Sequence, residues 1–141
     1  PQNGRRSRND RAGPERAERT PMARILLAED DDSLRRFLAR GLEAAGHDVI
    51  DVRDGITAVA ALEAGPYDIL IADIVMPGTD GIELARQAAG EMPGLKVMFI
   101  TGFAAVALKA RSMAAAKGGK VLSKPFHLKD LVDEVETALA A

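Results

Sequence analysis

Short apolar runs alternate with amphipathic stretches along most of the chain, and this alternation limits the possible folds more than any other feature. Runs that read as buried strands occupy 25–28, 49–52, 67–73, 96–101 and 120–123. Apolar residues at helical spacing predict helices over 32–45, 55–64, 81–90, 104–116 and 128–139. Strands and helices that alternate in this way form βαβ units around a parallel sheet. We therefore expect one doubly wound α/β domain with five parallel strands and helices on both faces.

The first helix illustrates how the pattern sets the expected details. Its apolar face is expected to contain five residues, Leu34, Phe37, Leu38, Leu42 and Ala45. Asp31 or Asp32 is placed to cap the start of this helix, and Gly46 is placed to end it.

Composition excludes several classes of protein. The 141 residues are enough for one domain with a real core. There is no cysteine, and His47 and His127 are the two histidines, so disulfides are excluded and a structural zinc site is not expected. The sequence has no apolar run near the roughly 20 residues of a membrane span and no signal peptide, so we expect a cytoplasmic protein without a membrane partner.

The first 21 residues differ from the rest. They contain six arginines and three acidic residues, a net charge of +3, and they lack Leu, Ile, Val and Phe. We expect 1–21 to be a disordered basic arm or a non-native extension, and 22–141 to be the folded domain. A contact of the arm with nucleic acid or an acidic surface is the alternative. The rest of the chain carries −5, which argues against nucleic-acid binding by the domain itself.

Polar residues follow four of the expected strands. Asp30 follows the first strand, Asp73 ends the third, Thr101 ends the fourth and Lys124 follows the fifth. The carboxyl ends of parallel strands meet at one edge of a sheet, where α/β proteins bind ligands. Clustered carboxylates without His or Cys suit Mg²⁺, and an aspartate can also form an aspartyl phosphate. Taken singly, each residue also has a structural reading, such as a helix cap, a turn or a strand former.

Three further features accompany these four residues: Glu29 before Asp30, Met76-Pro77 after the third strand, and Pro125-Phe126 after Lys124. The whole set resembles the receiver domain of two-component response regulators. The resemblance covers residues 24–141. It implies a flavodoxin-like sheet with the strand order 2-1-3-4-5. It also implies that Asp73 accepts phosphate from a histidine kinase or a histidine phosphotransferase.

The same resemblance implies a role for each site residue. Asp30, Asp73 and the backbone carbonyl of Val75 would bind Mg²⁺ directly, and Glu29 would bind it through water. Lys124, with a cis bond to Pro125, would pair with the phosphoryl group. Thr101 would move to donate a hydrogen bond to that group.

The last third of the chain is similar to a group of single-domain receivers of alphaproteobacteria that control regulated proteolysis during the cell cycle. This similarity implies an adaptor that, when unphosphorylated, primes ClpX/ClpXP for selected substrates. The terminal Leu139-Ala140-Ala141 is either a fraying helix end or a tag read by the protease. A phosphate sink or shuttle in a phosphorelay is the alternative function.

A different class, an Asp-nucleophile phosphatase, would need a second aspartate at position 75, where this chain has valine. We therefore expect a non-enzyme. Val121 stands where many receivers carry an aromatic residue, which puts the usual threonine–aromatic relay in doubt. Val75 and Phe103 are expected to lie near the path of attacking water and to prolong the life of the phosphoryl group.

Overall fold

The computed structural model describes residues 23–102, 114, 115, 117 and 120–140. The described residues contain a single five-stranded parallel sheet. The strands are β1 (Arg24–Ala28), β2 (Asp48–Val52), β3 (Ile69–Asp73), β4 (Lys96–Thr101) and β5 (Val121–Ser123). Their order is β2-β1-β3-β4-β5, and every neighbouring pair is parallel. The expected fold class and strand order are therefore confirmed.

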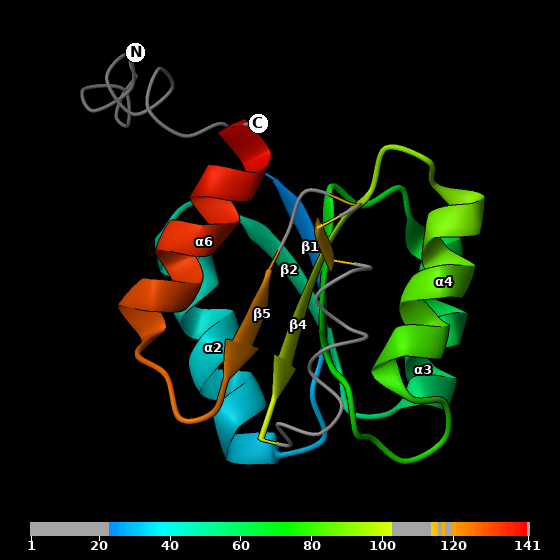
Figure 1. Ribbon diagram of the computed structural model, residues 1–141, viewed down its shortest axis with the longest axis horizontal. Helices are drawn as coiled ribbons and strands as arrows, with labels where there is room; N and C mark the ends of the chain where they lie inside the picture. The colour runs from blue at the N-terminus through cyan, green and yellow to red at the C-terminus, as the bar shows by residue number, and fades with distance from the viewer. Residues whose placement is uncertain (1–22, 103–113, 116, 118–119, 141) are drawn as a thin grey trace, which may run out of the picture.

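Helices cover both faces of this sheet. They are α2 (Asp32–Ala44), α3 (Gly55–Ala61) with the short 3₁₀ helix η2 (Leu62–Ala64), α4 (Gly81–Glu91) and α6 (Leu128–Ala140). Figure 1 shows α2 and α6 on one side of the sheet and α3 and α4 on the other. Within the described residues, no helix combines the length and the apolarity that crossing a membrane requires. Most of the helix expected over 104–116 lies outside the described residues, as does the arm 1–21.

The sheet separates two apolar layers. Leu26, Leu70 and Phe99 point from the central strands into the layer that α3 and α4 cover. Their immediate neighbours Ile25 and Ile71 point into the layer that α2 and α6 cover. Successive side chains of a strand face opposite sides, so a strand buried on both faces must be apolar at nearly every position.

Aspartates start three of the helices at the carboxyl edge of the sheet. The side chain of Asp31 accepts from the Leu34 amide at 2.9 Å, as the capping expectation for α2 required. Asp54 caps α3 and Asp80 caps α4 in the same way. Each cap satisfies an amide that has no partner within its helix, and it fixes the point where the chain leaves the sheet edge.

The buried face of α2 differs from the expectation. Phe37 was placed on the apolar face, but the residue is 56% exposed. The buried face runs instead through Arg35, Leu38, Ala39 and Leu42, and Phe37 lies nearly opposite to it on the helix. The sequence pattern failed here because the buried position is filled by an arginine whose charge is paired. Gly46 ends the helix as expected, with φ at +102°.

Two backbone features lie next to strand ends. The bond between Lys124 and Pro125 is cis, which confirms the expectation, and the bond between Gly65 and Pro66 is cis as well. Gly81, the first residue of α4, sits so close to β3 that a Cβ atom on it would overlap the carbonyl oxygen of Asp73. Its amide donates to the Ile74 carbonyl at 2.8 Å. The start of α4 therefore packs directly on the backbone of the aspartate that ends β3.

Candidate functional site

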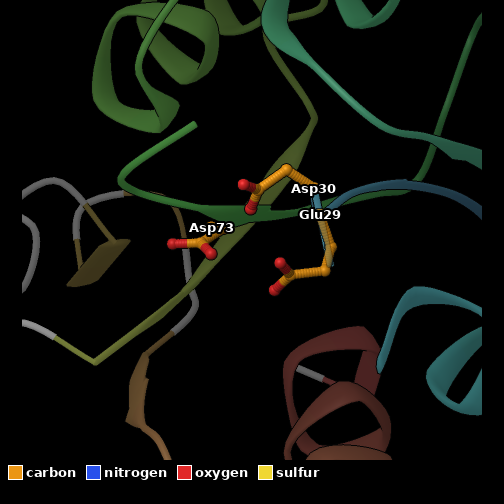
Figure 2. Close-up of side chains that lie close together, drawn as sticks. All are labelled: Glu29, Asp30 and Asp73. Carbon is orange, nitrogen blue, oxygen red and sulfur yellow. The ribbon is translucent and has the colours of Figure 1, made fainter. Parts of the chain in front are cut away.

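Three carboxylates from two neighbouring strands come together at the carboxyl edge of the sheet. Glu29 and Asp30 follow β1, and Asp73 ends β3, which pairs directly with β1. One oxygen of each side chain lies within 4.8 Å of the other two. Figure 2 shows the three side chains extending toward a common space, Asp73 from one strand and Glu29 and Asp30 from the other.

The three carboxylates differ in burial. Glu29 is fully buried and Asp73 is 5% exposed, whereas Asp30 is exposed to solvent. The cluster is therefore open on the Asp30 side and closed beneath Glu29. Such an arrangement admits an ion or a phosphoryl group from solvent while it keeps two of the carboxylates in a medium of lower dielectric constant.

Lys124 supplies a positive charge to this cluster. Its Nζ donates to Asp73 Oδ2 at 2.9 Å and lies 3.0 Å from Glu29 Oε1. Burial acts to lower the pKa of Lys124, but the two carboxylates outweigh burial and raise it, so the ammonium stays charged. The backbone amide of Lys124 donates to the Thr101 carbonyl at 2.7 Å, which ties the end of β5 to the end of β4.

The remaining carboxylate oxygens are held by backbone amides. Asp73 Oδ1 accepts from the Val75 amide at 3.1 Å, and Glu29 Oε2 accepts from the Asp31 amide at 3.0 Å. Glu29 Oε1 is buried and meets Lys124 as an ion pair without the geometry of a hydrogen bond. This oxygen retains acceptor capacity that faces the cluster.

The environment of Glu29 makes it a weak acid. Burial, and to a lesser degree the charge of Asp73, raise the pKa of Glu29 to about 7, against the lowering effects of the Asp31 amide and Lys124. Because this pKa lies above that of the unfolded chain, the folded state holds the proton more tightly. The stabilisation is present at low pH and is lost as the pH rises from about 4.5 through about 7.

We expect the protein without divalent cations to lose stability between pH 5 and pH 8, by on the order of 3 kcal/mol. Glu29→Gln removes the titrating group and should flatten this slope. Urea denaturation in EDTA at several pH values measures both proteins. Parallel pH profiles for wild type and Glu29→Gln would contradict this assignment.

Thr101 and Val75 also lie near this edge. Thr101 is buried at the end of β4, directly beside Ser123 in the strand register. Val75 follows Asp73 by two residues, and the residue is 46% exposed. Val121 lies on β5, half-buried against the layer under α3 and α4. Phe103 lies outside the described residues.

The sequence pattern did not single out Arg35, which the structure places beside the cluster. Its guanidinium is buried and contacts Asp32, Asp51 and the carbonyl oxygen of Glu29. The spacing of Asp32 and Arg35, three residues apart on one helix, is the signal that could have found the first of these pairs.

The donor set fits a hard divalent cation. Three carboxylates with a single ammonium leave excess negative charge, and the buried oxygen of Glu29 lacks a hydrogen-bond donor. All the donor atoms are oxygens, which Mg²⁺ prefers, and Asp30 leaves room for the waters that Mg²⁺ retains.

A parallel sheet in this order, with an acidic cluster and a lysine at its carboxyl edge, defines the class of two-component receivers. The sequence model of the response regulator receiver domain family matches residues 25–136 of this chain. The chain therefore belongs to this family. Over 120 residues it is 57% identical to the response regulator receiver protein CpdR of Brucella abortus. That match covers 85% of this chain and 99% of CpdR.

Solved receiver structures agree with the fold. The receiver domain of the hybrid histidine kinase CckA is 36% identical, with a TM-score of 0.68, and the match covers 82% of this chain and 98% of that one. The response regulator TrrA of Thermotoga maritima, in complex with Mg²⁺ and beryllofluoride, is 27% identical with a TM-score of 0.71. The match covers 84% of this chain and all of TrrA.

Proposed function

We propose that the chain is a phosphorylation-controlled switch in which Asp73 accepts a phosphoryl group from a phosphohistidine. The observation that carries this proposal is the position of Asp73 Oδ2, which is 2.9 Å from the Lys124 ammonium and borders two more carboxylates at an open sheet edge. A carboxylate oxygen in this position is available as a nucleophile.

Each neighbour of Asp73 has a role in this proposal. Asp30 and Asp73 would bind Mg²⁺ through their carboxylates, the Val75 carbonyl would be the third protein ligand, and Glu29 would bind through water. When bound, Mg²⁺ offsets negative charge on the phosphoryl oxygens. The oxygen-only donor set and the buried Glu29 Oε1 support this assignment.

In the transfer step, an Asp73 carboxylate oxygen attacks the phosphorus of phosphohistidine. The new P–O bond forms as the P–N bond breaks, and the imidazole leaves with the bonding electron pair and takes up a proton. Lys124 then moves its hydrogen bond from the Asp73 carboxylate to a phosphoryl oxygen. The raised pKa of Lys124 keeps its ammonium protonated throughout the transfer.

Thr101 completes the switch when its hydroxyl donates a hydrogen bond to the phosphoryl group. Because the Thr101 carbonyl accepts from the Lys124 amide, movement of one residue shifts the ends of both β4 and β5. Val121 is aliphatic, so the signal passes through the segment after Thr101 instead of through an aromatic residue on β5.

The output is a change in a protein–protein contact. Similarity to CpdR over 99% of that protein supports a role in cell-cycle-controlled proteolysis, in which the unphosphorylated form delivers substrates to ClpX/ClpXP. Similarity to CckA supports a histidine kinase or histidine phosphotransferase as the phosphoryl donor. The non-enzymatic role is supported by Val75, which offers no second acid beside Asp73.

Acetyl phosphate tests the first part of the proposal. With Mg²⁺, the intact protein should gain the mass of one phosphoryl group, and EDTA should prevent the gain because the phosphoryl charge is then unshielded. Intact-mass spectrometry measures both samples. Equal modification with and without EDTA would refute the metal-dependent mechanism.

A pull-down with and without beryllofluoride separates the adaptor from a phosphate sink. The unmodified protein should retain ClpX and a delivered substrate, and beryllofluoride with Mg²⁺ should release them. A protein that exchanges phosphate with its kinase but retains ClpX in neither state would be a sink.

A further inference from the structure

Arg35 is a buried cation that joins three parts of the chain beneath the acidic cluster. Its Nε donates to Asp51 Oδ2 on β2 at 3.0 Å, and its Nη2 pairs with Asp32 Oδ1 on α2 at 2.8 Å. Its Nη1 donates to the carbonyl oxygen of Glu29 at 3.0 Å. The side chain is 9% exposed, so these contacts are largely shielded from water.

The contact with Glu29 is the one that bears on the cluster. That carbonyl belongs to the peptide unit between Glu29 and Asp30, so fixing it fixes the directions in which both side chains leave the backbone. Figure 2 shows these two side chains diverging from adjacent backbone positions and then turning toward Asp73. A rigid planar guanidinium with donors in fixed directions suits such a clamp, whereas a lysine ammonium does not.

We propose that Arg35 is a positioning residue that holds Glu29 and Asp30 in the geometry that Mg²⁺ requires. The inference rests on the proposed function, in which these carboxylates bind Mg²⁺. Arg35 contacts neither the ion nor the phosphoryl group in this role. It acts through the Glu29 carbonyl, and Asp32 and Asp51 hold its guanidinium in place.

An effect of charge alone would have the opposite sign. A guanidinium near the cluster repels a divalent cation, so its removal would strengthen binding of every such cation. Loss of positioning instead weakens binding, and it does so unequally. Mg²⁺ demands near-ideal octahedral geometry, whereas Ca²⁺ accepts irregular sets of oxygen ligands. The ratio of Mg²⁺ to Ca²⁺ affinity therefore distinguishes displaced carboxylate ligands from the effect of the guanidinium charge.

The test compares Arg35→Lys, which keeps the charge, with wild type by calorimetric titration of Mg²⁺ and of Ca²⁺. We expect Arg35→Lys to lower the Mg²⁺ affinity about 10-fold, in the range known for residues that orient metal ligands. The Ca²⁺ affinity should fall less than about threefold, because Ca²⁺ tolerates displaced ligands. Arg53→Lys is the matched control, since Arg53 approaches the same Asp32 at 4.0 Å from the exposed side and should leave both affinities unchanged.

Asp51→Ala provides a second variant that leaves Arg35 in place but removes its partner on β2. It should lower the Mg²⁺ affinity more than the Ca²⁺ affinity, and it decides the matter if Arg35→Lys does not fold. An unchanged Mg²⁺ to Ca²⁺ ratio in the folded variants overturns the inference, as does tighter Mg²⁺ binding. Wild type that binds no Mg²⁺ would instead overturn the proposed function, and this inference with it.

Discussion

Asp73→Asn is expected to abolish modification of the protein by acetyl phosphate in the presence of Mg²⁺. The amide has no anionic oxygen to attack phosphorus, and in the proposed function the neighbouring carboxylates hold Mg²⁺ and do not attack the donor. Asparagine is close to aspartate in size, and its single amide oxygen can still accept from the Val75 amide, so we expect the fold to be retained. Intact-mass spectrometry after incubation with acetyl phosphate gives the result directly.

Asp80→Asn is the matched control for this experiment. Asp80 caps α4 by accepting from the Glu83 amide at 2.8 Å and does not belong to the carboxylate cluster. Asparagine caps helices about as well as aspartate, so this variant should fold and be modified like wild type. Modification of Asp73→Asn to the same extent as Asp80→Asn would refute Asp73 as the acceptor.

Gly81→Ala is expected to lower the free energy of unfolding by about 3 kcal/mol, near the upper end for overpacking. The added methyl group would overlap the Asp73 carbonyl oxygen, which belongs to the sheet backbone and cannot move aside as a flexible side chain would. The start of α4 must therefore shift away from β3. Urea denaturation measures the loss.

Gly90→Ala, on the same helix, provides the comparison. A Cβ atom at Gly90 meets nothing within 4 Å, so the substitution adds helix propensity without a clash. It should raise the free energy of unfolding by about 0.5–1 kcal/mol. If Gly81→Ala were as stable as Gly90→Ala, the close packing of α4 on the end of β3 would be wrong.

The sheet could be predicted from sequence because each strand leaves a strong signal. A parallel strand buried on both faces must be apolar throughout, and the residue that ends the run then stands out. Asp73 and Thr101 were found in this way at the ends of their strands. Once the topology is known, the carboxyl edge brings distant residues together without any further assumption.

Arg35 and Phe37 show where the same reasoning fails. Hydrophobic periodicity assigns an aromatic residue to the core and an arginine to the surface, yet Phe37 is exposed and Arg35 is buried. The burial of Arg35 depends on Asp51, which lies on β2 and becomes a neighbour of Arg35 only after folding. The raised pKa of Glu29 could not be predicted from the sequence for the same reason, because its burial arises only when the sheet edge is assembled.

The three aspartate caps place further negative charge around the cluster. Asp31, Asp54 and Asp80 begin α2, α3 and α4 at the edge that also holds Glu29, Asp30 and Asp73. Their summed field acts beyond contact distance and governs encounter rates. Such a field would draw divalent cations toward this edge and, in the proposed function, would slow the approach of small anionic phosphodonors. A protein donor that presents a basic surface would arrive faster, and added salt would reduce that advantage.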